Sequence, residues 1–330
     1  MTAMRYRPLG RTGLTVSEIG FGTWGLGGDS YGPADDDVSR AALRAAFDRG
    51  ITFYDTSDLY GAGHSETVLG AALEDVRARI VIGTKVGLLP HTGFAMPQDF
   101  SVAHLREGLE ASLDRLRTRY VDLYLLHSPE LGLLRDDPEI IATLKEFQAQ
   151  GKIRAWGLSA RSPADAKAGV EEFDFPAVQV NYNMIDQRAQ DDGLFALARA
   201  RGTGIIARTP LCFGYLTGKL AGDHRFTGRD HRANWPADQL SRWAEAPGLF
   251  AHLYDAAGQR TATQLALQFC LADDAVSTVI PGMMTAAEVD ENVMAAERPP
   301  LTAEELTDIR SIYASNTFYD RSAKQRGKQQ

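Results

Sequence analysis

The sequence has few features of an exported, membrane-bound or nucleic-acid-binding protein. Its 330 residues include only two cysteines, Cys212 and Cys270, too few for a disulfide framework and without the spacing of a metal site. No segment approaches the roughly 20 consecutive apolar residues of a membrane span, and residues 1–9 lack the apolar centre of a signal peptide. The net charge of −8 comes from 35 basic and 43 acidic residues spread along the chain. We therefore expect a soluble, cytoplasmic protein without a metal, membrane or nucleic-acid partner.

The residues that are present suffice for one full-sized globular domain. Hydrophobic residues make up 44% of the chain and charged residues 24%, an ordinary balance for a folded protein. Short apolar runs alternate with segments of helical periodicity, which is the pattern of β-α units with parallel strands. We expect a single domain over residues 1–330, with a frayed polar tail at residues 322–330.

Eight strands and eight helices alternate in this prediction. The predicted strands are residues 19–23, 52–55, 80–85, 121–127, 153–159, 177–179, 204–208 and 276–280. The predicted helices are residues 38–48, 66–73, 102–117, 138–149, 163–169, 192–201, 249–271 and 286–292. Eight alternating pairs favour an α/β fold of the closed (β/α)8 TIM-barrel type, with an open doubly wound sheet as the alternative.

Three segments lie outside the alternating pairs. Residues 6–9 and 14–16 flank a turn-like Gly-Arg-Thr-Gly stretch, which predicts an N-terminal β-hairpin that caps the bottom of the barrel. Residues 209–236 contain several glycines and basic residues, and a loop of that length is usually either a functional lid or disordered. A further helix from Thr302 to about Tyr313 is predicted after the last barrel helix.

Ionisable or amide side chains recur where the predicted strands end. They are Asp55, Lys85, His127, Ser159, Gln179 and Arg208. In a barrel the carboxyl ends of the strands form the active-site face, so these side chains should meet at one mouth. A lysine at the end of an apolar strand needs a partner, and Asp55 on the neighbouring strand is the obvious one. Each residue alone has a structural explanation, such as an ion pair or a core histidine, but their shared position favours a catalytic site.

Residues 20–25, Gly-Phe-Gly-Thr-Trp-Gly, fit the glycine pattern of a Rossmann dinucleotide site. That motif must open a helix directly and precede an acidic residue by about 20 positions. Here further glycines and Pro33 intervene, and no acidic residue is correctly placed. We interpret the glycines as strand-end packing and Trp24 as a wall of the substrate pocket.

Three separated motifs resemble those of the aldo-keto reductase family. Residues 53–61, Phe-Tyr-Asp-Thr-Ser-Asp-Leu-Tyr-Gly, are similar to the first signature of the family, residues 81–85 to its lysine strand and residues 120–127 to its histidine strand. The resemblance covers almost the whole chain. It implies a (β/α)8 barrel and an NAD(P)H-dependent oxidoreductase that reversibly reduces an aldehyde, ketone or sugar carbonyl.

The resemblance also implies a catalytic centre of Asp55, Tyr60, Lys85 and His127. Tyr60 would act as the general acid or base, and the Lys85 ammonium should lower its pKa from the usual value near 10. Asp55 would keep Lys85 charged and oriented. His127 would donate a hydrogen bond to the carbonyl oxygen.

The cofactor-binding residues that the resemblance implies extend from the nicotinamide to the adenosine end. They are Thr23, Ser159, Gln179, Arg208, Thr209, Pro210, Leu211, Gly214, Lys219, Gly282, Met284, Glu288, Glu291 and Asn292. Ser159 and Gln179 would bond the nicotinamide carboxamide. Two positions depart from the pattern: Ala160 stands where many relatives carry asparagine, and Arg208 where relatives often carry an aromatic ring that stacks on the nicotinamide.

Cofactor preference and substrate follow less directly from the motifs. Family tendency implies NADP(H), but Met284 cannot donate a hydrogen bond and Glu288 would repel a 2′-phosphate, so NAD(H) is the alternative. Arginines in residues 209–236 could supply the missing charge. The partner is a small carbonyl compound, and the oligomeric state is open. Two other functions fit the motifs: a nicotinamide-binding regulatory subunit, as in potassium channels, and a dedicated nucleotide-sugar or secondary-metabolite reductase.

Overall fold

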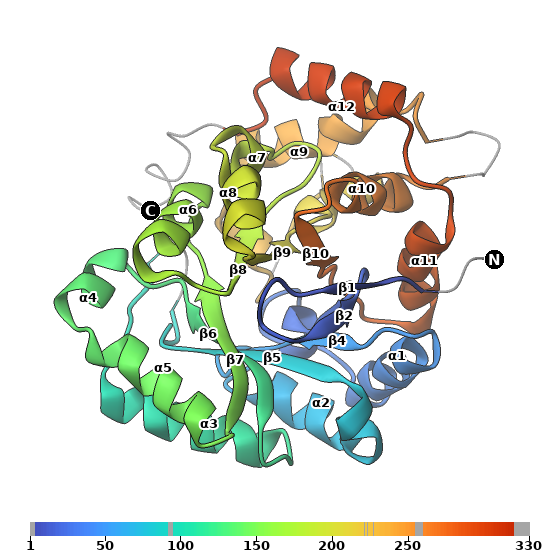
Figure 1. Ribbon diagram of the computed structural model, residues 1–330. Coiled ribbons are helices and arrows are strands. Elements are labelled where there is room, and N and C mark those ends of the chain that lie inside the picture. The colour runs from blue at the N-terminus through green and yellow to red at the C-terminus, as the bar shows by residue number, and fades with distance from the viewer. Residues whose placement is uncertain are drawn as a thin grey trace.

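Eight parallel strands form the central sheet of the computed structural model, which describes residues 4–91, 95–220, 222, 224–226, 228–254 and 260–319. Figure 1 shows how helices surround this sheet. The strands are β3 (Phe21–Gly22), β4 (Phe53–Asp55), β5 (Val81–Val86), β6 (Val121–His127), β7 (Ile153–Ser159), β8 (Ala177–Asn181), β9 (Gly204–Arg208) and β10 (Val276–Val279). Their spatial order follows the sequence from β3 to β10. The strands are almost wholly buried because one face meets the barrel interior and the other meets the helices.

The two outer strands of the sheet meet each other and close the barrel. Ile19, just before β3, forms a parallel bridge with Val279 of β10. Gly22 N donates to Pro281 O at 2.9 Å. A Cβ atom at Gly22 would lie 2.9 Å from Ile280 O, so a larger residue would push these segments apart. The predicted (β/α)8 barrel is confirmed, and Gly22 packs a strand end as expected.

A small antiparallel hairpin closes the bottom of the barrel. It consists of β1 (Tyr6–Pro8) and β2 (Thr15–Ser17), as predicted. Gly10 in its turn has φ +50° and lies against the backbone of Gly204 at the start of β9, where no side chain fits. The hairpin and the barrel interior share one apolar cluster: Leu9, Leu14, Val16, Phe53, Leu123, Leu125, Ala155, Ala177, Ile206 and Ile280.

Helices cover the outside of the barrel. Eight of them follow the strands: α1 (Asp36–Asp48), α2 (His64–Leu73), α3 (Val102–Arg115), α5 (Glu139–Ala149), α6 (Pro163–Phe173), α8 (Leu194–Arg201), α10 (Ala262–Leu271) and α11 (Ala286–Glu297). Others are inserted or added: α4 (Leu131–Asp136), α7 (Arg188–Asp191), α9 (Ala237–Leu249) and the predicted C-terminal α12 (Ala303–Ser315). The described residues also contain four 3₁₀ helices: η1 (Trp24–Gly27), η2 (Glu74–Arg79), η3 (Cys212–Thr217) and η4 (His231–Asn234). None of the described helices has the length and hydropathy needed to cross a membrane.

Several predicted helices are wrong in their extent. The helices expected over residues 163–169 and 286–292 are longer and end at Phe173 and Glu297. The helix expected over residues 249–271 does not exist as one element, because α9 ends at Leu249 and Thr261 starts α10 with a capping box to Gln264. The helix expected over residues 192–201 begins only at Leu194, since Gly193 takes a left-handed conformation with φ 80°. Helices α4, α7 and α9 were not predicted, and the tail at residues 322–330 lies outside the described residues.

Candidate active site

One large cavity opens at the carboxyl ends of the strands, with a volume of about 2550 Å³. Most of the predicted site residues line it: Trp24, Asp55, Tyr60, His127, Gln179, Arg208, Thr209, Pro210, Leu211, Gly214, Lys219, Gly282, Met284, Glu288, Glu291 and Asn292. Thr23, Lys85 and Ser159 are fully buried and hydrogen-bond to residues of the cavity wall. The fold therefore gathers the predicted residues at one place, although Thr23 faces the protein interior.

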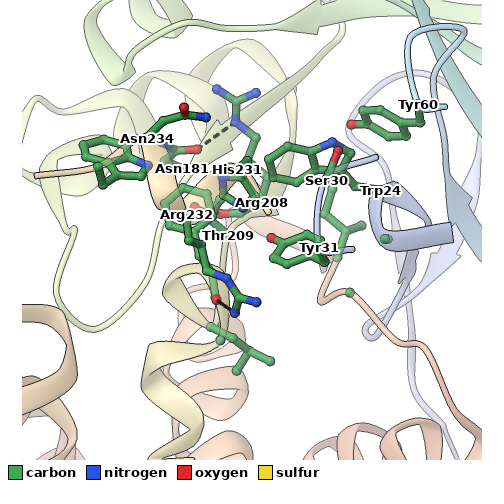
Figure 2. Close-up of a pocket in the computed structure, with 18 of the residues that line it drawn as sticks. Trp24, Ser30, Tyr31, Tyr60, Asn181, Arg208, Thr209, His231, Arg232 and Asn234 are labelled. Carbon is green, nitrogen blue, oxygen red and sulfur yellow. Dashed lines mark hydrogen bonds between the residues drawn. The ribbon is translucent and has the colours of Figure 1, made fainter. Parts of the chain in front are cut away.

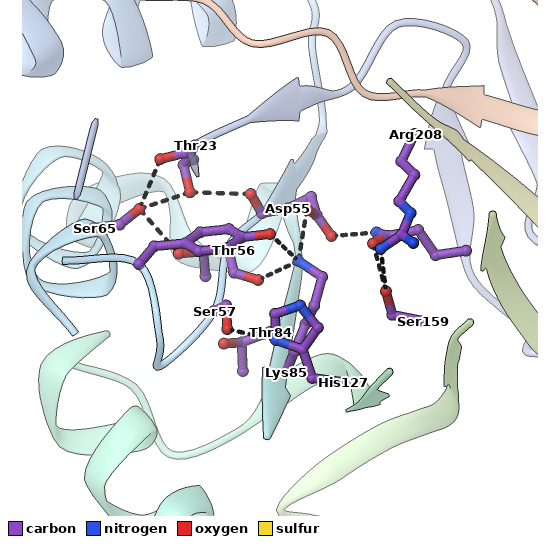
Figure 3. A network of polar contacts seen from close by, with 12 residues as sticks. Thr23, Asp55, Thr56, Ser57, Ser65, Thr84, Lys85, His127, Ser159 and Arg208 are labelled. Atoms are coloured by element: carbon purple, nitrogen blue, oxygen red, sulfur yellow. Dashed lines mark hydrogen bonds and ion pairs between the residues drawn. The ribbon is translucent and has the colours of Figure 1, made fainter. Parts of the chain in front are cut away.

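Lys85 is held between Asp55 and Tyr60 (Figure 3). Its Nζ donates to Asp55 Oδ2 at 2.7 Å, to Thr56 O at 2.6 Å and to Tyr60 Oη at 3.1 Å. The side chains of Lys85 and Asp55 are 0% and 3% exposed, so the pair is shielded from water. Burial alone would lower the pKa of Lys85, but the negative charge of Asp55 and the hydrogen bonds to Asp55 and Tyr60 raise it. The ammonium is therefore charged, and all three of its protons are engaged.

The phenol of Tyr60 is the member of this group that lines the cavity. Burial raises the pKa of Tyr60 above its ordinary value, and the Lys85 ammonium offsets only part of that effect. The expectation that Lys85 gives Tyr60 a lowered pKa is therefore wrong, because desolvation of the phenolate raises this pKa by more than the ammonium lowers it. At neutral pH Tyr60 keeps the proton that a carbonyl reduction consumes.

His127 lies beside Tyr60 as a neutral imidazole. The two ring centroids are 6.1 Å apart, and the rings are nearly perpendicular. Burial lowers the pKa of His127 well below its usual value, and the positive charges of Lys85 and Arg208 act in the same direction. Its Nδ1 lies 3.2 Å from Ser57 Oγ. His127 can therefore donate from only one of its two ring nitrogens.

A chain of hydrogen bonds connects Asp55 with Arg208 on the far side of the barrel mouth (Figure 3). Gln179 Nε2 donates to Asp55 Oδ1 at 2.6 Å, and Ser159 Oγ donates to Gln179 Oε1 at 3.0 Å. Arg208 in turn donates from NH1 to Ser159 Oγ at 3.3 Å. The amide of Gln179 is thus already bound to protein on both sides, which the sequence did not show. It keeps one N–H and one lone pair for a ligand.

Arg208 occupies the wall without a carboxylate partner. Its Nε donates to Asn181 Oδ1 at 2.7 Å and its NH2 to Ala160 O at 2.7 Å. It forms no ion pair within the described part of the chain, and burial lowers its pKa. Sequence reasoning missed Asn181, which fixes the guanidinium plane. The wall therefore carries a positive charge that only neutral groups contact directly.

Aromatic side chains gather beside Tyr60 in the cavity wall (Figure 2). Trp24 packs on His231 with ring centroids 4.4 Å apart and meets the edge of Tyr31 at 5.2 Å. The backbone N–H of His231 donates to Ser30 O at 2.9 Å, and Tyr31 bridges to Asp230. Described residues from the predicted lid, 209–236, thus form one wall of the cavity with the segment after β3.

The opposite end of the cavity lies at the start of α11. Glu288 Oε2 accepts from Met284 N at 2.7 Å and from Thr285 N at 3.1 Å, which makes Glu288 part of a helix-capping box. The Thr-x-x-Glu spacing from Thr285 to Glu288 is the sequence signal of such a box. Nearby, Lys219 Nζ donates to Glu291 Oε2 at 2.9 Å, a pairing between distant segments that the sequence could not reveal.

The model of the Aldo/keto reductase family matches residues 18–314 of the chain. The chain belongs to this family. L-galactose dehydrogenase of Arabidopsis thaliana is 32% identical over 325 residues, which cover 94% of this chain and 95% of that protein. A probable voltage-gated potassium channel subunit beta of the same plant is 30% identical over 317 residues, covering 90% and 93%.

The solved structures include a holo-form aldo-keto reductase from Bacillus halodurans with a TM-score of 0.79. It is 31% identical and matches 96% of this chain and 99% of that one. As a member of the family, the present chain is an oxidoreductase that works with a nicotinamide cofactor and a small carbonyl substrate. The barrel fold of the chain is therefore consistent with its membership of the family.

Proposed function

We propose that this aldo/keto reductase transfers a hydride reversibly between NAD(P)H and an aldehyde, ketone or sugar carbonyl. The observation that carries the proposal is the position of Lys85 Nζ, 3.1 Å from Tyr60 Oη and 2.7 Å from Asp55 Oδ2, at the cavity wall. The cavity volume of about 2550 Å³ leaves room for a dinucleotide and a small substrate. We take the chain as a single barrel domain that carries this activity.

The proposed mechanism assigns one step to each of four residues. Carbonyl reduction needs a hydride at carbon, which the nicotinamide supplies when bound, and a proton at oxygen. Tyr60 donates that proton, because burial keeps the phenol protonated. Lys85 then stabilises the phenolate, and Asp55 keeps the ammonium charged and in place. His127 donates a hydrogen bond to the carbonyl oxygen when its Nε2 carries the proton.

The residues of the wall fit a nicotinamide dinucleotide. Ser159 and Gln179 offer a hydroxyl and an amide for the carboxamide, and the flat guanidinium of Arg208 lies beside them. The remaining predicted contacts would come from Thr23 near the nicotinamide and, along the rest of the dinucleotide, from Thr209, Pro210, Leu211, Gly214, Lys219, Gly282, Met284, Glu288, Glu291 and Asn292. Except for the buried Thr23, all of these line the cavity.

The charge of Arg208 should favour the reduced cofactor. The nicotinamide ring is positively charged when oxidised and neutral when reduced, so an unpaired guanidinium in the same wall repels only the oxidised form. Arg208→Met should therefore tighten the oxidised cofactor relative to the reduced one by about tenfold, measured by fluorescence titration of both forms. Arg208→Lys keeps the charge and serves as the control. An unchanged ratio in the methionine variant would contradict this role.

We propose NADP(H) as the cofactor, with NAD(H) as the alternative. Family tendency favours NADP(H), but two features at the start of α11 weaken that preference. Glu288 lines the cavity there and accepts hydrogen bonds from two backbone N–H groups, and its negative charge would repel a 2′-phosphate bound nearby. Lys219 is neutralised by Glu291. An unphosphorylated ribose could instead donate its hydroxyl to Glu288.

Exchanging Glu288 should shift the cofactor preference. Glu288→Arg replaces a repulsion with a charge-assisted contact, and the ratio of dissociation constants should move toward NADP(H) by about tenfold or more. Because arginine also breaks the capping box, Glu288→Gln is the matched control: it keeps the box, removes the charge and should shift the ratio in the same direction by less. Titrations in which neither variant moves the ratio would refute this placement.

Turnover decides between the enzyme and the two alternatives. A regulatory subunit of the channel type would bind the cofactor without multiple turnovers, and a dedicated reductase would accept one compound from a wide panel. We expect turnover with reduced cofactor on a panel of sugars, ketones and aromatic aldehydes, measured by loss of NAD(P)H absorbance. Cys212 and Cys270 are buried free thiols, which supports our proposal of a reducing, cytoplasmic setting.

A further inference from the structure

The proton of His127 must sit on Nε2 if this residue is to donate to a carbonyl oxygen. A neutral imidazole carries one proton, and when Nδ1 holds it, Nε2 can only accept. Whatever faces Nδ1 therefore decides whether His127 can act as proposed. That partner is Ser57 Oγ, 3.2 Å away and fully buried.

Ser57 has one hydroxyl proton, which it can donate to either of two acceptors. Its Oγ lies 3.0 Å from Asp58 Oδ1 and 3.2 Å from His127 Nδ1, and it accepts a hydrogen bond from Leu59 N at 3.2 Å. Both candidate acceptors cannot receive the same proton. The direction of one hydrogen bond thus fixes the direction of the other.

Two arrangements satisfy every group in this cluster. When Asp58 is ionised, the Ser57 hydroxyl donates to the carboxylate, His127 donates from Nδ1 to Ser57 Oγ, and Nε2 is left as an acceptor. When Asp58 is protonated, its O–H donates to Ser57 Oγ, Ser57 donates to Nδ1, and Nε2 carries the proton. Only the second arrangement lets His127 donate into the cavity.

We propose that Asp58 is a positioning residue that selects, through Ser57, which nitrogen of His127 carries the proton. The effect of Asp58 on turnover rests on the proposed carbonyl reduction. Its effect on the tautomer of His127 does not depend on that proposal. A simple turn role for Ser57 and Asp58 explains the bond from Leu59 N, but it does not require a buried hydroxyl shared between a carboxyl group and an imidazole.

The surroundings of Asp58 bring its titration close to neutral pH. Its side chain bonds to Ser57 and forms no ion pair in the described part of the chain. Burial, followed by the negative charge of Glu66, raises the pKa of Asp58 to about 7. Arg115 on α3 opposes this shift but is itself bound to Glu66 Oε2 at 2.7 Å, and Tyr124 on β6 is an uncharged neighbour.

The groups around His127 keep it neutral over the same range. Lys85, Arg208 and His91 all act to lower its pKa, as does burial. Because the pKa of Asp58 is raised, its protonated form, and with it the Nε2–H tautomer, prevails below about pH 7 and is lost above. Carbonyl reduction should therefore decline on the alkaline side by about tenfold, the effect of losing one hydrogen bond to the substrate.

Long-range ¹H–¹⁵N spectra of ¹⁵N-histidine-labelled apoenzyme test this inference directly. His127 is identified by its absence from a His127→Gln sample. We expect its proton to move from Nε2 to Nδ1 between about pH 5.5 and 8.5 in the wild type. The transition should vanish in both Asp58→Asn and Ser57→Ala. It should persist in Asp192→Asn, which makes the same charge change at an exposed position of the cavity rim.

Kinetics supply the second readout. The alkaline decline of kcat/KM for reduction should disappear in Asp58→Asn and remain in Asp192→Asn. A tautomer that does not change with pH in the wild type, or a transition that survives in Asp58→Asn, would overturn the inference. Since the spectra are recorded without cofactor or substrate, a tautomer switch in a protein without turnover would support this inference and reject only the proposed function.

Discussion

Tyr60→Phe should lower kcat for carbonyl reduction by about 10²- to 10⁴-fold, the contribution typical of a positioned general acid. The substitution removes the hydroxyl that lies 3.1 Å from Lys85 Nζ, but Lys85 keeps its bonds to Asp55 and Thr56 O, so the local fold should hold. Cofactor affinity should change little, because the phenol acts on the substrate oxygen. Steady-state rates and a fluorescence titration of the cofactor measure the two effects separately.

Tyr120→Phe provides a matched loss of a hydroxyl group. Tyr120 precedes β6 at the end of the strand opposite His127, where Arg77 and Arg154 stack on its ring. Loss of the Tyr120 hydroxyl group should leave kcat unaffected. Near-native turnover in the Tyr60 variant would reject Tyr60 as the proton donor.

Lys85→Met should abolish most activity and destabilise the protein. The ammonium offsets part of the burial effect on Tyr60, so its loss should raise the pKa of Tyr60 further. In the direction of alcohol oxidation, which needs the phenolate, the rise of the pH–rate profile should move to higher pH. The substitution also leaves Asp55 as a buried carboxylate without its cation, at a cost of about 3–5 kcal/mol in the free energy of unfolding.

A double variant separates the two consequences. Asp55→Asn combined with Lys85→Met removes both charges, so urea unfolding should show recovered stability relative to Lys85→Met alone. Turnover should stay low, since Tyr60 still lacks its cation. An unshifted pH–rate profile in Lys85→Met would mean that the lysine is structural only.

The positions of the strands could be predicted because most of their residues are apolar and the intervening segments have helical periodicity. Lys85 is the last residue but one of β5 and His127 is the last residue of β6, so both ionisable side chains lie where their strands leave the barrel. Helix ends were harder to predict, because the break between α9 and α10 depends on local capping by Thr261 rather than on hydrophobic periodicity. The capping role of Glu288 could be predicted from the Thr-x-x-Glu spacing. The sequence prediction instead assigned Glu288 to the cofactor ribose because it carries a carboxylate.

The sequence by itself determined the barrel and the meeting of Asp55, Lys85 and His127, since parallel strands of one barrel all end at the same face. Only the tertiary structure decided how these groups bond. The net pKa of Tyr60 depends on burial, which no spacing reveals. The contacts of Ser57 with His127 and of Arg208 with Asn181 join distant segments of the chain, and hydrogen bonds are decided by atomic distance and direction, not by order along the chain.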